Sequence, residues 1–103
     1  MHEFVSISCI VNNGFSEEAM NAAKQFGAKG GTVIHGRGTV SKEAEKFFNI
    51  TIQPEKEIVL ILVPSKDKDA IMRGLYNAVG TNTVAQGIVF SLPVDDVIGI
   101  ETK

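Results

Sequence analysis

Glycine is concentrated in residues 27–38, which makes this segment the first candidate for binding chemistry. Polar side chains, among them Thr32, His35 and Arg37, stand between the glycines. Glycine lets backbone N–H groups approach an anion closely, and the planar guanidinium of Arg37 can donate paired hydrogen bonds to phosphate or carboxylate. The spacing matches neither G-x-G-x-x-G nor a Walker A loop. The segment indicates an anion-binding loop or, as an alternative, a helix end followed by turns and a strand bulge. Its glycines are Gly27, Gly30, Gly31, Gly36 and Gly38.

Other residue types that carry chemistry are few and scattered. The soft metal ligands are His2, Cys9 and His35, and they share no short motif, so we expect no metal site. The adjacent pair Asp95-Asp96 is typical of a capped turn, and the charged run Glu55-Lys56-Glu57 is interpreted as a solvated strand entrance. Because no nucleophile–base pair or opposed carboxylate pair stands out, we expect no catalytic residues and no enzyme activity.

Length and composition describe one folded domain. The 103 residues are 44% hydrophobic and 21% charged, which is ordinary for a globular protein and unlike a disordered chain. A net charge of −2 gives no general attraction to nucleic acid or an anionic membrane. The longest apolar run, Ile58 to Val63, is too short to span a bilayer, the first residues do not resemble a secretion signal, and the single Cys9 fits a reducing compartment. We therefore expect one cytoplasmic domain over residues 1–103.

The pattern of apolar residues predicts elements in the order β-α-β-loop-β-α-β. Strands are predicted at residues 4–11, 32–38, 58–63 and 87–92, with a short terminal strand at 97–102. One helix is predicted to begin after an N-cap at Ser16, and a second after a cap at Ser65 or Asp67. This order is that of an α+β, ferredoxin-like double split βαβ sandwich, with a four-stranded antiparallel sheet and two helices on one face. The helix residues expected to be buried are Ala19, Ala22, Ala23, Phe26, Ile71, Met72, Leu75, Ala78 and Val79.

The strands are too apolar for a sheet that has one face exposed to solvent. Right-handed crossovers place both helices on the same side, so the other side should alternate apolar and polar residues. Residues 58–63 are instead apolar at every position, and Ile88-Val89-Phe90 continues the pattern. Leaving this area in water would forfeit about 25 cal/mol per Å² of apolar surface. We expect a closed homo-oligomer packed through its sheets; the alternatives are a small barrel-like monomer or a covering loop.

Two separate stretches resemble the signatures of the PII nitrogen-regulatory signal proteins. Residues 27–33, Gly-Ala-Lys-Gly-Gly-Thr-Val, followed by Gly36 and Gly38, resemble the first signature, and residues 87–97 resemble the C-terminal one. Residues 57–64 look like the strand between them. The resemblance implies a ferredoxin-like fold, a closed homotrimer and adenine-nucleotide sites in clefts between subunits. It also implies that the loop after the second strand, about 39–55, binds a target transporter or enzyme.

The resemblance also assigns residues to the two sides of the cleft. One wall would carry Thr32, Gly36, Arg37 and Gly38, and the opposing loop before the last strand would carry Gln86 and Gly87. Three phosphate-binding charges of the family are missing, because its lysine after the glycine is Ile88 here and its two C-terminal arginines are Gly99 and Glu101. Each charge-assisted contact is worth about 1.5–3 kcal/mol. ADP, AMP or a cyclic nucleotide therefore fits better than ATP, and an empty or repurposed cleft is the alternative.

The connecting loop departs from the family pattern as well. It is several residues shorter, has no tyrosine for uridylylation, and reads Thr39-Val40-Ser41-Lys42 where the family has a glutamine that helps to hold 2-oxoglutarate and magnesium. We therefore expect no 2-oxoglutarate sensing of the familiar kind. Phe47, Phe48 and Ile50 are interpreted as core or trimer contacts, or else as a partner-binding patch. Two alternatives to a nucleotide sensor stay open: a trimeric metal-binding protein of the divalent-cation tolerance type, and a non-sensing scaffold trimer.

Overall fold

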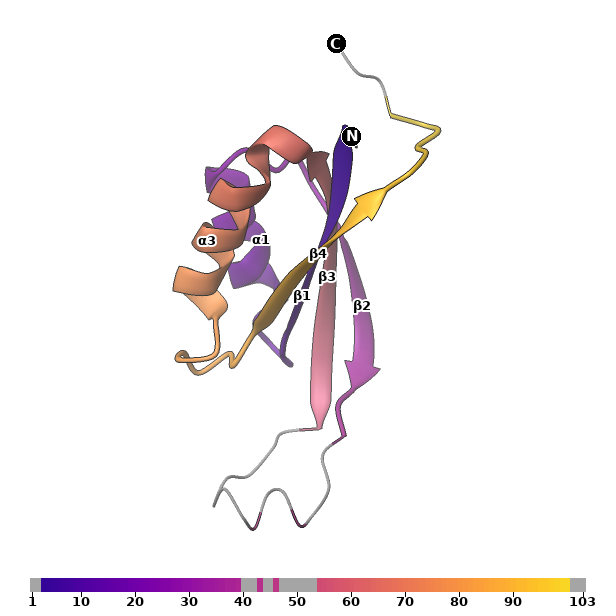
Figure 1. The fold of residues 1–103 in the computed structure, drawn as a ribbon. Coiled ribbons are helices and arrows are strands. Elements are labelled where there is room, and N and C mark those ends of the chain that lie inside the picture. The colour runs from indigo at the N-terminus through magenta and orange to yellow at the C-terminus, as the bar shows by residue number, and fades with distance from the viewer. Residues whose placement is uncertain (1–2, 40–42, 44–45, 47–53, 101–103) are drawn as a thin grey trace.

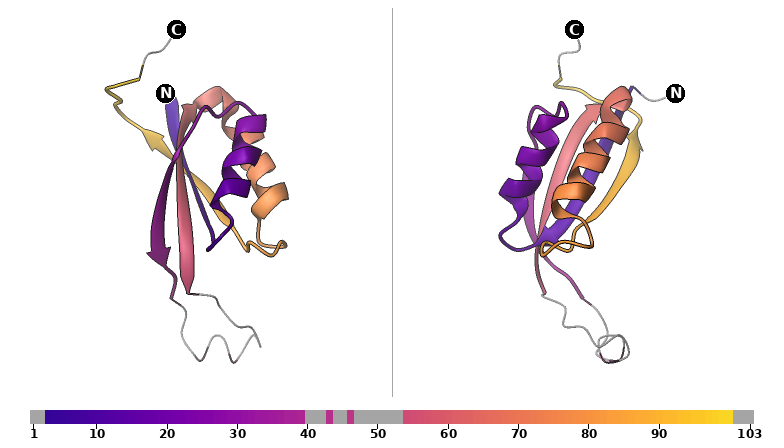
Figure 2. Two further views of the ribbon diagram at one scale, coloured as in Figure 1. Left: turned by 180° about the vertical axis from the view of Figure 1, so that it is seen from behind. Right: turned by 90° about the vertical axis from the view of Figure 1, so that its left-hand side faces the viewer.

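The computed structural model describes residues 3–39, 43, 46 and 54–100, which form a single sheet covered by helices on one face (Figures 1 and 2). The strands lie in the order β2-β3-β1-β4, and every pairing is antiparallel. This arrangement confirms the predicted ferredoxin-like double split βαβ sandwich. The elements are β1 (Phe4–Asn12), α1 (Ser16–Gln25), β2 (Thr32–Arg37), β3 (Glu55–Pro64), the 3-10 turn η1 (Ser65–Asp67), α3 (Lys68–Val79) and β4 (Ile88–Val94).

The core lies between the two helices and the central strands. Alternate residues of β1 and β3 face the helices, so that Ile7 and Ile61, which pair across the strands, are both fully buried. The helix α3 meets them with Ile71, Leu75 and Val79, as its periodicity predicts. Cys9 also lies in this core, and burial raises the pKa of its thiol to about 11.

Phe26 is an exception to the predicted core, because 45% of its surface is exposed. It lies one residue beyond α1, and the following Gly27 has a positive φ of 115° that ends the helix. The ring of Phe26 rests on Gly74 of α3, where a side chain would collide with it. Phe26 is therefore part of the contact between the two helices at their outer side, and the prediction that it would be buried is wrong.

The ends of several helices and strands differ from the predicted ones. Strand β3 begins at Glu55 rather than Ile58, and helix α3 begins only after the 3-10 turn, with no side-chain cap from Asp67. Ser16 is the first residue of α1 instead of its N-cap. Residues 97–100 do not form the predicted terminal strand, and the remainder of that strand, like most of loop 39–55, lies outside the described residues.

The face of the sheet opposite the helices is apolar and bare in the described part of the chain (Figure 2). Strand pairing places Ile10 between Ile58 and Ile88 on this face. The side chains exposed along it are those of Ile34, Leu62, Ile88, Phe90 and Leu92, each with 36–56% of its surface in solvent. We call this surface the open face.

Candidate ligand-binding site

Strand β2 carries the predicted site residues to two different ends of the sheet. Thr32 pairs with Leu60, near the middle of β3, whereas Gly36 pairs with Lys56 and Arg37 with Glu55, at the start of that strand. The register therefore separates Thr32 from Gly36, Arg37 and Gly38. The two regions have different surroundings and are described in turn.

At the Gly36 end, the side chain of Lys56 lies against Gly38. Lys56 lies on the open face, opposite Gly36. A Cβ at Gly38 would stand 2.9 Å from Cε of Lys56, so this position favours glycine. The backbone N–H of Gly38 donates a hydrogen bond of 2.7 Å to the carbonyl of Pro54, which closes the base of the segment between them. The lysine is thus packed against the stem of the predicted partner loop.

Asn12, on the neighbouring strand β1, links the Lys56 ammonium group to the segment before β4. The Nζ of Lys56 donates a hydrogen bond of 2.6 Å to Oδ1 of Asn12, and Nδ2 of Asn12 donates to Oε1 of Gln86 at 3.3 Å and to the carbonyl of Val84 at 3.1 Å. Although β2 and β4 are opposite edges of the sheet, Gly38 and Gln86 are connected through Lys56 and Asn12. The two glycine-bearing segments of one chain are therefore linked through two side chains at one end of its sheet.

The segment before β4 is itself tightly defined. Gln86 has a left-handed backbone with φ of 50°, which is rare for a residue with a side chain. The N–H of Gly87 donates a hydrogen bond of 2.7 Å to the carbonyl of Val79, and a Cβ at Gly87 would collide with that carbonyl. Gly87 also borders a groove of about 660 Å³ beside Arg73 and Ile88. The predicted pair Gln86-Gly87 occupies a strained corner at the edge of the sheet.

A large open cavity lies at the Thr32 end. Its volume is about 1160 Å³, and it is lined chiefly by residues 27–32 and 60–67, with further contributions from both ends of the described chain. Among the predicted site residues it is lined by Thr32 alone. Gly31 is required in its wall, because a Cβ there would stand 2.8 Å from the carbonyl of Leu60. Lys29 and Lys66 add positive charge to the lining, and Glu3 and Asp67 add negative charge.

The positively charged groups at the Gly36 end differ from those expected of the family. Arg37 is exposed, and its guanidinium has no hydrogen bond or ion pair within residues 3–39, 43, 46 and 54–100. Ile88, in place of the family lysine, leaves 56% of its surface exposed at the start of β4. Gly99 has a φ of 110° and open space around its α-carbon, and Glu101 lies outside the described residues. Lys56 and Arg37 are thus the two positively charged residues on β2 and β3 near the Gly36 end.

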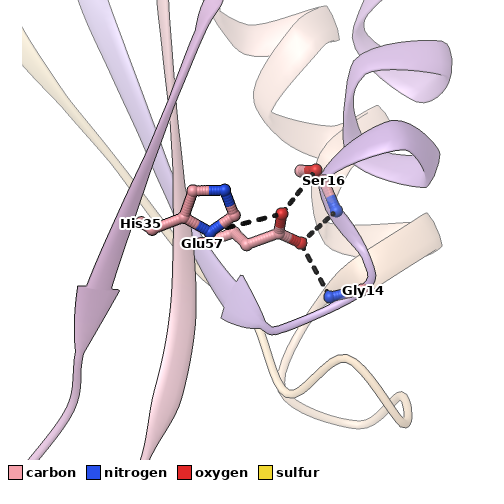
Figure 3. A network of polar contacts seen from close by, with 4 residues as sticks. All are labelled: Gly14, Ser16, His35 and Glu57. Carbon is pink, nitrogen blue, oxygen red and sulfur yellow. Dashed lines mark hydrogen bonds and ion pairs between the residues drawn. The ribbon is translucent and has the colours of Figure 1, made fainter.

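The charged run Glu55-Lys56-Glu57 at the start of β3 is solvated only at Glu55, which corrects the prediction for Glu57. Glu57 is only 7% exposed, and its carboxylate accepts hydrogen bonds from the N–H of Gly14 at 2.7 Å and from the N–H and hydroxyl of Ser16 at 3.2 and 3.1 Å (Figure 3). Burial raises the pKa of Glu57, but these hydrogen bonds and the nearby His35 outweigh it and hold the pKa below its usual value. Glu57 thus accepts the N–H of the first residue of α1 from a distant strand, whereas Ser16, which the sequence pattern assigns as the cap, donates to it.

His35 lies outside Glu57 on the helix side of β2. Its Nδ1 is 3.9 Å from Oε2 of Glu57, and 76% of its side chain is exposed. Within residues 3–39, 43, 46 and 54–100, no group of three or more His, Cys, Asp or Glu side chains is arranged to hold a metal ion. In the same residues, neither helix has the length and apolar character needed to cross a bilayer.

Sequence reasoning missed Lys56 and Asn12, which join the two predicted segments. The local pattern places Lys56 in a solvated run and Asn12 in a turn, because their proximity depends on the register of β1 against β3. One signal was available: Lys56 has the same strand parity as Ile58 and Leu60, which places it on the open face. Once a strand is extended back to residue 55, that parity points to a buried lysine stem beside Gly36.

Comparison with known proteins agrees with this fold. The family model "Nitrogen regulatory protein P-II" matches residues 4–103. A crystal structure of PII from Arabidopsis thaliana bound to citrate is similar to the chain, with a TM-score of 0.73 and 22% sequence identity, over 97% of this chain and 82% of the other. No curated protein sequence matches the chain closely enough to add to this comparison. Because the family model spans nearly the whole chain, the chain belongs to the nitrogen regulatory protein P-II family.

Proposed function

We propose that this protein is a PII-type regulator rather than an enzyme, and that it works in the cytoplasm. It binds an adenine nucleotide or a related small anionic metabolite in clefts between subunits, and it thereby controls a partner transporter or enzyme. The observation that carries the proposal is the link between Gly38 and Gln86, which runs through the side chains of Lys56 and Asn12. A fixed cation beside backbone that carries no side chains lets an anionic ligand approach closely and favours its binding.

The charges at this end favour a ligand smaller than a triphosphate. Lys56 and Arg37 can each donate charge-assisted hydrogen bonds, while Ile88 at the opposing edge cannot donate any. We therefore favour ADP, AMP or a cyclic nucleotide over ATP. The similar Arabidopsis PII is bound to citrate, a small polycarboxylate, which supports an anion of this size in a protein with this fold.

The open face supports a closed homotrimer. Its exposed side chains, Phe90 and Leu92 among them, would lose contact with water if three sheets packed against one another. In that assembly we place the Gly36–Gly38 end of one subunit against the cavity lined by Thr32 in the next. Gln86 and Gly87 then belong to the same wall as Gly36, because they are connected within one chain.

The ligand is expected to act on the partner through the loop at about 39–55. The stem of this loop is held by the hydrogen bond from Gly38 to Pro54, directly beside Lys56. A ligand that draws the ammonium group of Lys56 toward itself therefore changes the packing at the stem. Such a change can favour one arrangement of the loop and hence one state of the partner complex.

Calorimetry against ATP, ADP, AMP, cyclic AMP, 2-oxoglutarate and citrate tests the proposal, together with light scattering for the assembly. Arg37→Ala should weaken binding about 10-fold to 100-fold, the equivalent of one charge-assisted contact. Lys24→Ala, which removes an exposed charge at the end of α1, is the control and should leave binding unchanged. A trimer that binds none of these compounds would be a scaffold, and the sensor proposal would be wrong.

A further inference from the structure

Asn12 is the buried polar residue at which the two proposed ligand-binding segments are joined. It is 5% exposed, at the end of β1. Its side-chain oxygen accepts from Lys56, and its side-chain nitrogen donates to Gln86 and to the carbonyl of Val84. Its backbone N–H donates a further hydrogen bond of 2.9 Å to the carbonyl of Ala85. Three consecutive residues before Gly87 are thus tied to one asparagine.

The amide group suits this position for a chemical reason. A neutral oxygen fixes the direction of the Lys56 ammonium group without cancelling its charge, whereas a carboxylate 2.6 Å away would form an ion pair with it. The amide also donates, which a carboxylate cannot do, and it needs to donate to both Gln86 and Val84. Asparagine therefore leaves the charge of Lys56 uncancelled and at the same time holds the segment before β4 in place.

We propose that Asn12 is a positioning residue for the anionic part of the ligand. It holds the charged Lys56 at the end of the sheet and makes the Gly36–Gly38 and Gln86-Gly87 segments one wall. The inference rests on the proposed function, because it concerns the same ligand. It goes further by assigning the charge of the wall to Lys56 and the geometry of the wall to Asn12.

A double-mutant cycle with inorganic pyrophosphate and ADP as probes tests this role. Lys56→Gln should weaken both probes about tenfold or more, as the loss of one charge-assisted contact does. Asn12→Asp should weaken them to a similar extent, because the new carboxylate neutralises Lys56. A double variant that combines Lys56→Gln with Asn12→Ser, which adds no charge, should lose less affinity than the sum of the two single losses, since part of each single loss is the same contact between Asn12 and Lys56. Additive losses would overturn the proposal.

Asn21→Asp is the matched control. Asn21 is exposed on α1, so this change alters the net charge by the same amount and should shift probe affinity less than about twofold. Thermal unfolding without probe separates damage to the fold from loss of the charge. If Asn12→Asp does not unfold cooperatively, Asn12→Ser replaces it: the serine leaves Lys56 charged but poorly held, so affinity should lie between wild type and Lys56→Gln. An Asn12→Ser affinity equal to that of wild type would overturn the proposal.

The outcomes also distinguish this inference from the proposed function. Wild-type protein that binds neither ADP nor pyrophosphate contradicts both. Wild-type binding that survives Lys56→Gln leaves a ligand-binding regulator but overturns the role of Asn12. If Lys56→Gln loses affinity for the probes and Asn12→Asp does not, only the role of Asn12 is overturned.

Discussion

At the scale of single residues, the least expected feature is a carboxylate that serves a helix 41 positions away in sequence. Glu57 lies in the buried layer of β3 and accepts hydrogen bonds from the N–H of Ser16, the first residue of α1, and from the N–H of Gly14 in the turn before it. A local pattern search looks for a cap close to the helix start in sequence and therefore selects Ser16. The contact between Glu57 and Ser16 depends on the tertiary fold, which no local sequence pattern contains.

Replacing Glu57 by glutamine should destabilise the protein by about 1–3 kcal/mol at pH 7, because charged hydrogen bonds become neutral ones at a buried site. The pKa of Glu57 is lowered in the folded state, so its stabilising effect is present above the unfolded pKa of about 4.3 and is lost as pH falls through the folded pKa. The difference in unfolding free energy between wild type and Glu57→Gln should therefore shrink on acidification below about pH 4.

Urea denaturation at a series of pH values measures this difference. Glu55→Gln is the control, because Glu55 is an exposed neighbour on the same strand and should change stability little at any pH. A difference between wild type and Glu57→Gln that stays constant from about pH 7 to about pH 3 would show that the charge of Glu57 does not support α1.

At the scale of elements, the loop from α1 to β2 is shaped by close packing on β3. Gly31 approaches the backbone of Leu60 so closely that a Cβ would lie 2.8 Å from its carbonyl oxygen and 2.9 Å from Sδ of Met20. The methionine can move, but the strand backbone cannot. At Gly30, one position earlier, a Cβ would have no other atom within 4 Å. Adjacent glycines in one loop thus have different physical roles.

Gly31→Ala should lower the free energy of unfolding by about 1–3 kcal/mol, since the methyl group collides with the backbone of β3 and forces the loop away from it. Gly30→Ala should leave stability unchanged or raise it by about 0.4–1 kcal/mol, because alanine restricts the unfolded chain. Thermal unfolding of the two variants side by side checks the prediction. Equal stabilities would mean that the loop yields freely at Gly31.

The elements also show what could be read from the sequence. Alternation in Val5, Ile7, Cys9 and Val11 predicts β1 correctly, because burial against the helices demands that pattern. Residues 97–100 are largely apolar too, yet they form no strand, since a periodic pattern does not specify a pairing partner. The glycines of the candidate site stand out in the sequence, and the resemblance selects Gln86. Lys56 and Asn12 do not stand out, because strand register brings them together.

At the scale of the whole molecule, no helix covers the open face of the sheet in the part of the chain that the structure describes. Helices cover the face that carries Ile7 and Ile61, whereas Phe90 and Leu92 on the other face remain in contact with water. A monomer with such a surface would tend to associate without specificity. A closed ring of sheets would bury the surface and leave no edge for further addition, which fits the proposed trimer.

Leu92→Glu should prevent assembly, because it places a charge in the centre of the proposed contact, where its desolvation is not compensated. Light scattering should then give the mass of one chain. Binding of ADP should be lost as well, because the proposed site needs the wall that a second subunit contributes. Ala70→Glu is the control, because Ala70 is exposed on α3, on the other side of the sheet from the open face. An assembly of Leu92→Glu with the wild-type mass would contradict sheet-to-sheet packing.

The hydrogen bond between Gly38 and Pro54 has a consequence for how such proteins diversify. This hydrogen bond fixes the distance between the two ends of the segment that joins β2 to β3. The N–H of Asn13 donates a second hydrogen bond to the carbonyl of Glu55, the residue after Pro54. Doubling the length of a loop closed in this way adds only about 0.6 kcal/mol of entropy cost. Segment 39–53 can therefore be lengthened, shortened or exchanged with little effect on the sheet. If this segment binds a target as proposed, its sequence can change without altering the proposed ligand-binding end of the sheet.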